Sequence, residues 1–197
     1  RLHSLTGIVP VGLFLIFHLF TNMQMVFPGK FQHEVEFIHG LPALIFLEIF
    51  GLWLPIGFHA ALGVVYTFTG TKTNTADYPY WGNVRYTLQR ITGIIALVFI
   101  FFHVATLRWQ WDIFVFTPFF LEGPLDDGTM HPLAHASTTM ALNAHWLVIL
   151  LYVVGVYSAV YHCCNGLWTA AITWGVTSSD KAQKQFAYVC RLLFVGL

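Results

Sequence analysis

The sequence predicts an all-α integral membrane protein, a single domain over residues 1–197 built as a bundle of five transmembrane helices. Hydrophobic residues make up 57% of the chain and charged residues only 9%, whereas a soluble domain carries about 25% charged residues. The mean hydropathy is +0.67. The sequence contains several apolar runs, each with a length close to the roughly 20 residues that a helix needs to cross a bilayer. This composition excludes a soluble globular domain and a disordered chain.

The apolar runs define the individual spans. We expect complete spans at residues 5–26, 42–68, 88–107 and 145–174, and an incomplete fifth span at 185–197. The first, second and fourth spans stop at glycine or proline, which interrupt helices. Because the chain starts at Arg1 rather than Met and stops within an apolar run, we expect it to be a fragment of a somewhat longer protein.

The distribution of cations predicts a cytoplasmic N-terminus. One side of the predicted bundle collects most of the Lys and Arg residues: Arg1, Lys72, Arg85, Arg90, Lys181 and Lys184. The other side carries Lys30 and Arg108 beside several acids. Cytoplasmic connections are enriched in cations, so the first side faces the cytoplasm. The formal net charge of +0 gives no basic footprint for nucleic acid.

Four histidines lie deep inside the apolar runs, one in each complete span: His18, His59, His103 and His162. Ionisable side chains at membrane depth are costly and usually mark function. A lone histidine on an apolar face is most often a satisfied structural residue. Four of them, one per helix, instead indicate paired ligation of a cofactor.

The positions of these histidines sort them into two pairs. His18 and His103 lie within 8 residues of the outer ends of their spans, whereas His59 and His162 lie 17 residues from theirs. Two such pairs suit two b-type haems stacked across the bilayer inside the first four helices. Two imidazoles fill both axial positions of haem iron and leave electron transfer as its role.

Small residues support a flat macrocycle near these histidines. Gly63 and Gly166 follow His59 and His162 by one helical turn, on the same face. Gly7 and Gly93 each stand in a Thr-Gly-Ile sequence about three turns before a histidine of the outer pair. The alternative is close helix–helix packing, which also favours small residues.

These motifs resemble a known family. They read Arg1-Leu-His-Ser-Leu-Thr-Gly7, Gln89-Arg-Ile-Thr-Gly93, His59-x-x-x-Gly63 and His162-x-x-Asn-Gly-Leu-Trp168. The chain is similar over nearly its whole length to the five-helix, di-haem cytochrome b anchor of succinate:menaquinone oxidoreductases, a superfamily that includes fumarate reductases. The resemblance implies that the four histidines ligate haem, first helix with third and second with fourth.

The resemblance also implies partners and a location. It implies a prokaryotic inner membrane, an iron–sulfur subunit, and a flavoprotein with covalent FAD in which succinate is oxidised. Electrons from this tricarboxylic acid cycle step would enter the respiratory chain as menaquinone is reduced at the anchor. The inner connections 71–88 and 177–184 would then dock the iron–sulfur subunit.

A few polar residues are candidates for quinone or proton chemistry. Glu48 is the only acid well inside a span, so it either transfers protons to a quinone or is a protonated structural residue. Near the inner face, His3, Ser4, Gln89 and Arg90 are placed to contact a haem propionate or a quinone. Arg90 could instead extend its charge to the interface.

Other classes of protein share parts of this pattern. A di-haem anchor of the nitrate reductase or formate dehydrogenase type is one alternative, although the motifs fit it less well. A pigment-binding protein in which each histidine ligates one chlorophyll is another. A third is a transporter with a histidine proton relay, which would carry no chromophore.

Overall fold

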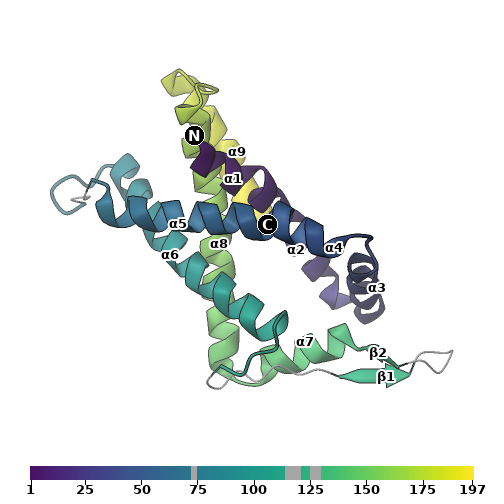
Figure 1. The fold of residues 1–197 in the computed structure, drawn as a ribbon. Coiled ribbons are helices and arrows are strands. Elements are labelled where there is room, and N and C mark those ends of the chain that lie inside the picture. Colours follow the sequence, from purple (N-terminus) through teal and green to yellow (C-terminus); the bar gives the residue numbers. More distant parts are fainter. Residues whose placement is uncertain (72–74, 114–120, 125–129) are drawn as a thin grey trace. The chain divides into compact units, whose positions relative to one another are not determined.

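The part of the protein described by the computed structural model is mostly helical (Figure 1). It comprises residues 1–71, 75–113, 121–124 and 130–197, so the predicted cytoplasmic cation Lys72 lies outside it. In chain order the elements are α1 (Leu2–Ile8), α2 (Pro10–Met23), the 3₁₀ helix η1 (Gln24–Val26), α3 (Pro28–His39), α4 (Leu44–Phe46), the π-helix η2 (Leu47–Trp53), α5 (Leu54–Thr69), α6 (Trp81–Leu107), α7 (Ala134–Asn143), α8 (Trp146–Thr173) and α9 (Asp180–Gly196). Two short strands, β1 (Glu122–Pro124) and β2 (Met130–Pro132), pair antiparallel.

Four helical segments are long and apolar enough to cross a membrane. Among the described residues these segments are Leu2–Val26, Leu44–Thr69, Trp81–Leu107 and Trp146–Thr173, with mean hydropathies between 1.7 and 2.0. Their bounds agree with those of the first four predicted spans within a few residues at most ends. The predicted fifth span falls on α9, which has 17 residues. A five-span count and a cytoplasmic N-terminus therefore stay predictions.

The third span begins earlier than the apolar pattern predicts. The helix starts at Trp81 rather than near residue 88. The prediction followed the apolar run, which begins at Leu88 and therefore excludes Arg85. In the structure its Nε donates to Asn165 Oδ1 at 2.7 Å and its guanidinium stacks on Trp168. A polar side chain with such partners lets the helix continue, so the connection before α6 is shorter than expected.

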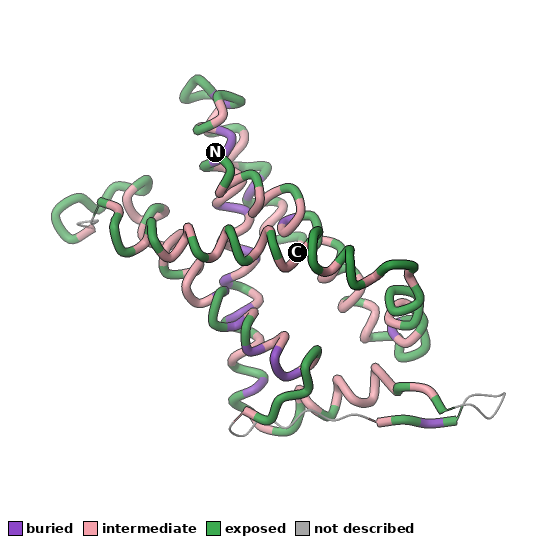
Figure 2. Tube along the Cα trace, viewed as in Figure 1, coloured by how far each residue is buried: buried purple, intermediate pink, exposed green. Residues whose placement is uncertain are grey.

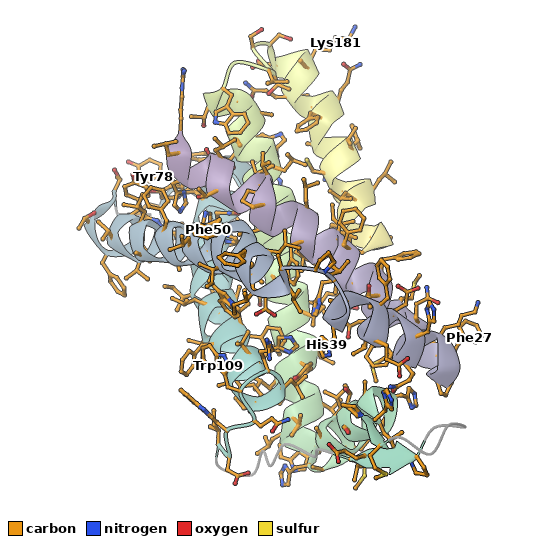
Figure 3. The ribbon with its side chains drawn as sticks, turned by 45° about the vertical axis from the view of Figure 1, so that its right-hand side comes forward. Phe27, His39, Phe50, Tyr78, Trp109 and Lys181 are labelled. Carbon is orange, nitrogen blue, oxygen red and sulfur yellow. The ribbon has the colours of Figure 1, made fainter. Side chains whose placement is uncertain are left out.

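The surface of these helices is apolar, as expected of a membrane protein. Buried residues occur along α6 and α8, singly or as adjacent pairs, while α2 and α5 are almost entirely exposed or half-buried (Figure 2). Phe27, Phe50 and Trp109 are among the exposed aromatic side chains (Figure 3). Lipid tails can cover such surface, whereas soluble proteins rarely expose apolar patches of this extent.

The chain forms two compact units, and the boundary between them falls within α2, α4, α6 and α8. The first contains residues 1–16, 45–97 and 155–197. There α1 lies against α5, and small side chains fill the core, among them Ala96, Cys164, Ala170 and Ala171. Small residues let helix backbones approach closely where lipid supplies no hydrophobic drive.

The second unit contains residues 17–44 and 98–154. In it α3 lies against α7, and the buried Phe31 meets His135 edge-on. His135 Nε2 also bonds the carbonyl of Met25 at 3.1 Å. The long connection that follows α6 therefore folds back onto α3 and η1 through described contacts.

Two local features bear on the candidate site. The π-helix η2 carries Glu48 in its first turn, and π-helical turns are often found at functional sites. After α8, Gly175 has a φ of +78°, the left-handed conformation typical of a glycine that ends a helix.

Candidate functional site

The structure brings the four deep histidines together as two pairs. In the first unit, the ring centres of His59 on α5 and His162 on α8 lie 6.0 Å apart, with an interplanar angle of 84°. In the second unit, the ring centres of His18 on α2 and His103 on α6 lie 5.6 Å apart at 75°. These are the pairs that the positions in the sequence predicted.

The two separations fit a single iron between the rings of each pair. A metal–imidazole bond is about 2 Å, and the ligating nitrogen lies about 1 Å from the ring centre, so two axial imidazoles need about 6 Å between centres. The observed distances are 6.0 Å and 5.6 Å. Across the described residues, no group of three or more His, Cys, Asp or Glu side chains could hold a metal ion. Each pair is therefore a two-ligand set, which suits a metal whose remaining positions are filled by a macrocycle.

Backbone and hydroxyl oxygens bind the Nδ1 atoms of three of these histidines. His59 Nδ1 lies 2.8 Å from the carbonyl oxygen of His3, and His162 Nδ1 lies 3.0 Å from that of Gln89. His103 Nδ1 lies 3.1 Å from the hydroxyl of Tyr152. An Nδ1–H that donates to oxygen fixes the tautomer and leaves Nε2 free to ligate a metal.

The first unit repeats one arrangement on two helix pairs. On α1 and α5, Gly7 faces the ring of His59, and Gly63 faces Nε2 of His3. In each case a Cβ added to the glycine would meet the facing side chain, within 3.3 Å of Nε2 at Gly63. The imidazole of His59 thus packs on Gly7 of the neighbouring helix. His3, four residues before Gly7, supplies the carbonyl that binds His59 Nδ1.

The second copy of this arrangement lies on α6 and α8. A Cβ on Gly93 would stand 2.8 Å from Cε1 of His162, and one on Gly166 would stand 3.2 Å from Nε2 of Gln89. All four glycines predicted to lie near the cofactor therefore surround the His59/His162 pair. The space beside these glycines is filled by side chains of the site, the rings of His59, His3 and His162 and the amide of Gln89.

His3 lies directly beside His59. Their rings stack at 4.1 Å with an interplanar angle of 12°, and Tyr66 meets His3 edge-on. The Nε2 atom of His3 is buried, and no hydrogen-bond partner is found for it among the described residues. A buried polar nitrogen without a partner is costly, which suits a site where a ligand oxygen completes the bond.

The other predicted inner-face residues are held by the protein itself. Ser4 Oγ donates to the carbonyl of Arg1 at 2.9 Å and accepts from Trp174 Nε1 at 3.2 Å. Gln89 bonds His162 and Asn165. These contacts place Gln89 beside His162, and they hold Ser4 of α1 against Trp174.

Arg90 stabilises the end of α5. Its guanidinium donates to the carbonyls of Tyr66 at 3.2 Å and Thr71 at 2.9 Å, and it also contacts Tyr86. The last carbonyls of a helix lack intrahelical partners and bind cations well. The structure therefore gives Arg90 a helix-capping role, and a Cβ at Gly70 would collide with its guanidinium.

The comparisons with known proteins agree with this geometry. The chain is 38% identical over 199 aligned residues to the succinate dehydrogenase cytochrome b558 subunit of Bacillus subtilis (strain 168), an alignment that covers 100% of this chain and 89% of that protein. The chain belongs to the succinate dehydrogenase cytochrome b family. No family model matches it, and no solved structure matches it.

Membership of the cytochrome b family establishes the general setting. It makes this chain a multi-pass membrane subunit of an oxidoreductase complex that contains other subunits. A cytochrome b carries haem b, and the histidine pairs described above are two-ligand sets of the kind such a haem takes.

The sequence alone indicated no role in this cytochrome b site for several of its residues. Asn165, Arg85 and Trp168 lie in contact around the His162 pair, and Tyr152 bonds His103. Asn165 stands three residues after His162, and Arg85 four before Gln89, spacings that place each on its neighbour's helix face. Nothing in the spacing of Tyr152 indicated its partner.

Proposed function

We propose that this cytochrome b subunit binds two haem b groups and connects a cytoplasmic iron–sulfur subunit with menaquinone in succinate dehydrogenase. The observation that best supports this proposal is the presence of two histidine pairs, whose ring centres lie 6.0 Å and 5.6 Å apart. When bound, each haem supplies a reversible one-electron iron couple. Family membership favours this proposal over a nitrate reductase, formate dehydrogenase, chlorophyll-binding or transporter function.

The protein's own residues give each ligand a defined direction. The carbonyls of His3 and Gln89 accept from the Nδ1 atoms of His59 and His162, so the Nε2 atoms are the ligating atoms. In the other pair the Tyr152 hydroxyl does the same for His103. Such outer contacts raise the basicity of an imidazole ligand and fix its ring.

Quinone chemistry is proposed for two places. His3 Nε2 is a buried donor without a partner in the described structure, and Ser4 lies next to it, so this pair could bind a quinone oxygen or a haem propionate. Glu48 is half-buried on the π-helix and is the proposed proton-transfer group at a second position. We place the His3 end at the cytoplasmic face, following the cation distribution.

The partner surface is proposed at the cytoplasmic connections. Two connections make up this surface. One leads into the N-terminal end of α6, and the other, residues 174–179, joins α8 to the N-terminal end of α9. Ser179 caps α9 by accepting from the backbone N–H of Ala182 at 3.2 Å, which fixes one side of this surface. An iron–sulfur subunit docked here would contact the connections at which α5 and α8, the helices that carry His59 and His162, end.

The visible spectrum and haem content of the purified complex test this proposal. We expect two haem b per copy of this chain, and loss of one haem in His59→Ala and of the other in His18→Ala. His145→Gln is the control, because the His145 ring contacts only the start of its own helix among the described residues. A wild-type complex with one haem or none, or a His59→Ala variant with both haems, would refute it.

A further inference from the structure

A hydrogen-bonded chain leads from α6 through α8 to the ring of His162. Arg85 Nε donates to Asn165 Oδ1 at 2.7 Å, and Asn165 Nδ2 donates to Gln89 Oε1 at 2.7 Å. Gln89 then contacts His162 at three places: its Nε2 donates to the His162 carbonyl at 3.1 Å and lies 3.2 Å from His162 Nδ1, and its own carbonyl lies 3.0 Å from the same Nδ1.

An aromatic side chain anchors the far end of this chain. The Arg85 guanidinium carbon lies 3.7 Å from the centre of a Trp168 ring, and Trp168 Nε1 donates to the Gln183 carbonyl on α9 at 3.0 Å. A desolvated cation over an indole face is a favourable contact. Trp168 therefore joins α8 directly to α9, and the stacked Arg85 joins α6 to the same side chain.

Among the described residues, no equivalent hydrogen-bonded chain leads to the partner histidine, His59. His59 uses the carbonyl of His3 in the same way, but the residue corresponding to Asn165, three positions after the histidine, is Leu62, whose side chain cannot form a hydrogen bond. The residue corresponding to Gln89 is His3, which stacks on His59. Among the described contacts, an amide and a guanidinium orient only one of these two ligands.

We propose that Asn165 and Arg85 are positioning residues that set the ring orientation of His162 through Gln89. Asn165 is only 5% exposed, and both ends of its amide are used. Loss of either end leaves a buried polar group unpaired, so Gln89 shifts and the imidazole plane turns. This inference rests on the proposed haem ligation by His59 and His162.

Electron paramagnetic resonance of the oxidised, purified complex tests the inference. The low-spin signal of a bis-imidazole haem reports the angle between its two ligand planes. In Asn165→Leu we expect the signal of the His59/His162 haem to shift while that of the His18/His103 haem stays unchanged. Asn165→Asp keeps an acceptor for Arg85 but loses the donor to Gln89, and should show the same shift.

Two further variants separate orientation from packing and charge. Arg85→Lys keeps a positive charge but loses the planar Nε–H, so it should also shift the signal. Thr169→Val is the matched control, because the Thr169 hydroxyl donates only to the Asn165 backbone carbonyl one turn away. It should leave both signals in place.

The outcomes distinguish this inference from the proposed function. A wild-type complex without two low-spin haem signals overturns the proposed function and the inference with it. If the wild type shows two normal signals and neither moves in Asn165→Leu, the positioning role alone is overturned. The same holds if the signal moves in Asn165→Leu but not in Asn165→Asp. An equal shift in Thr169→Val also overturns it.

Discussion

Replacing Gly93 by alanine should displace His162 and weaken the haem site that we propose around it. An added Cβ would stand 2.8 Å from Cε1 and 3.1 Å from Nδ1 of the His162 ring. The ring must retreat by at least 0.6 Å, the difference between 2.8 Å and the 3.4 Å at which ordinary contact begins. It cannot retreat freely, because Nδ1 is bound to the Gln89 carbonyl.

The size of the effect follows from the usual cost of overpacking. Inserting one methyl group into a packed interior costs about 1–3 kcal/mol, which corresponds to roughly 5- to 150-fold weaker holding of the group it displaces. Haem titration of the purified complex measures this directly. Gly57→Ala is the matched control on α5, since a Cβ there meets nothing within 4 Å; it should keep both haems.

One result would refute the reasoning about Gly93. If Gly93→Ala keeps its full haem content and an unchanged spectrum, the glycine does not seat His162. If Gly57→Ala loses haem as readily as Gly93→Ala, the loss reflects a general effect of alanine in these helices rather than contact with the ring.

The remaining predictions concern four single side chains. Tyr152→Phe removes the Nδ1 partner of His103, so the haem of that pair should be held about 10- to 100-fold less tightly; unchanged retention in a haem-transfer assay would contradict this. Glu48→Gln should slow quinone turnover with both haems intact, and normal turnover would remove the proton-transfer role. His3→Leu should raise KM for a quinone analogue more than it lowers kcat, and an unchanged KM would argue against a quinone contact. Arg90→Met removes the guanidinium bonds to the carbonyls of Tyr66 and Thr71, so thermal unfolding should show a loss of about 1 kcal/mol; an unchanged melting temperature would contradict the capping role.

The ends of the spans show where sequence reasoning succeeds and fails. Span ends at Val26, Gly70 and Gly175 were predicted well, because proline and glycine interrupt helices locally. The start of α6 was placed too late because the apolar run begins only at Leu88, after Arg85. Its true partners, Asn165 and Trp168, are distant in sequence, and no local pattern reveals a long-range bond.

The histidines show the same division within the candidate site. The pairing of His59 with His162 followed from counting residues along two helices, because the rise per residue is constant. The glycines did not follow so simply: Gly7 and Gly93 face the rings of His59 and His162 across helix boundaries, although they were noted for their spacing from the other pair. Helix rotation about its own axis decides which neighbour a glycine meets.

The sequence by itself determined the membrane class, four spans, the deep histidines and their pairing, because these depend on composition and on helical spacing along one segment. Only the tertiary structure decided that Arg90 caps α5, that His3 stacks on His59 and that Asn165 links Arg85 to Gln89. Each of these contacts joins side chains from different helices, and their existence depends on how the helices are rotated and packed against one another.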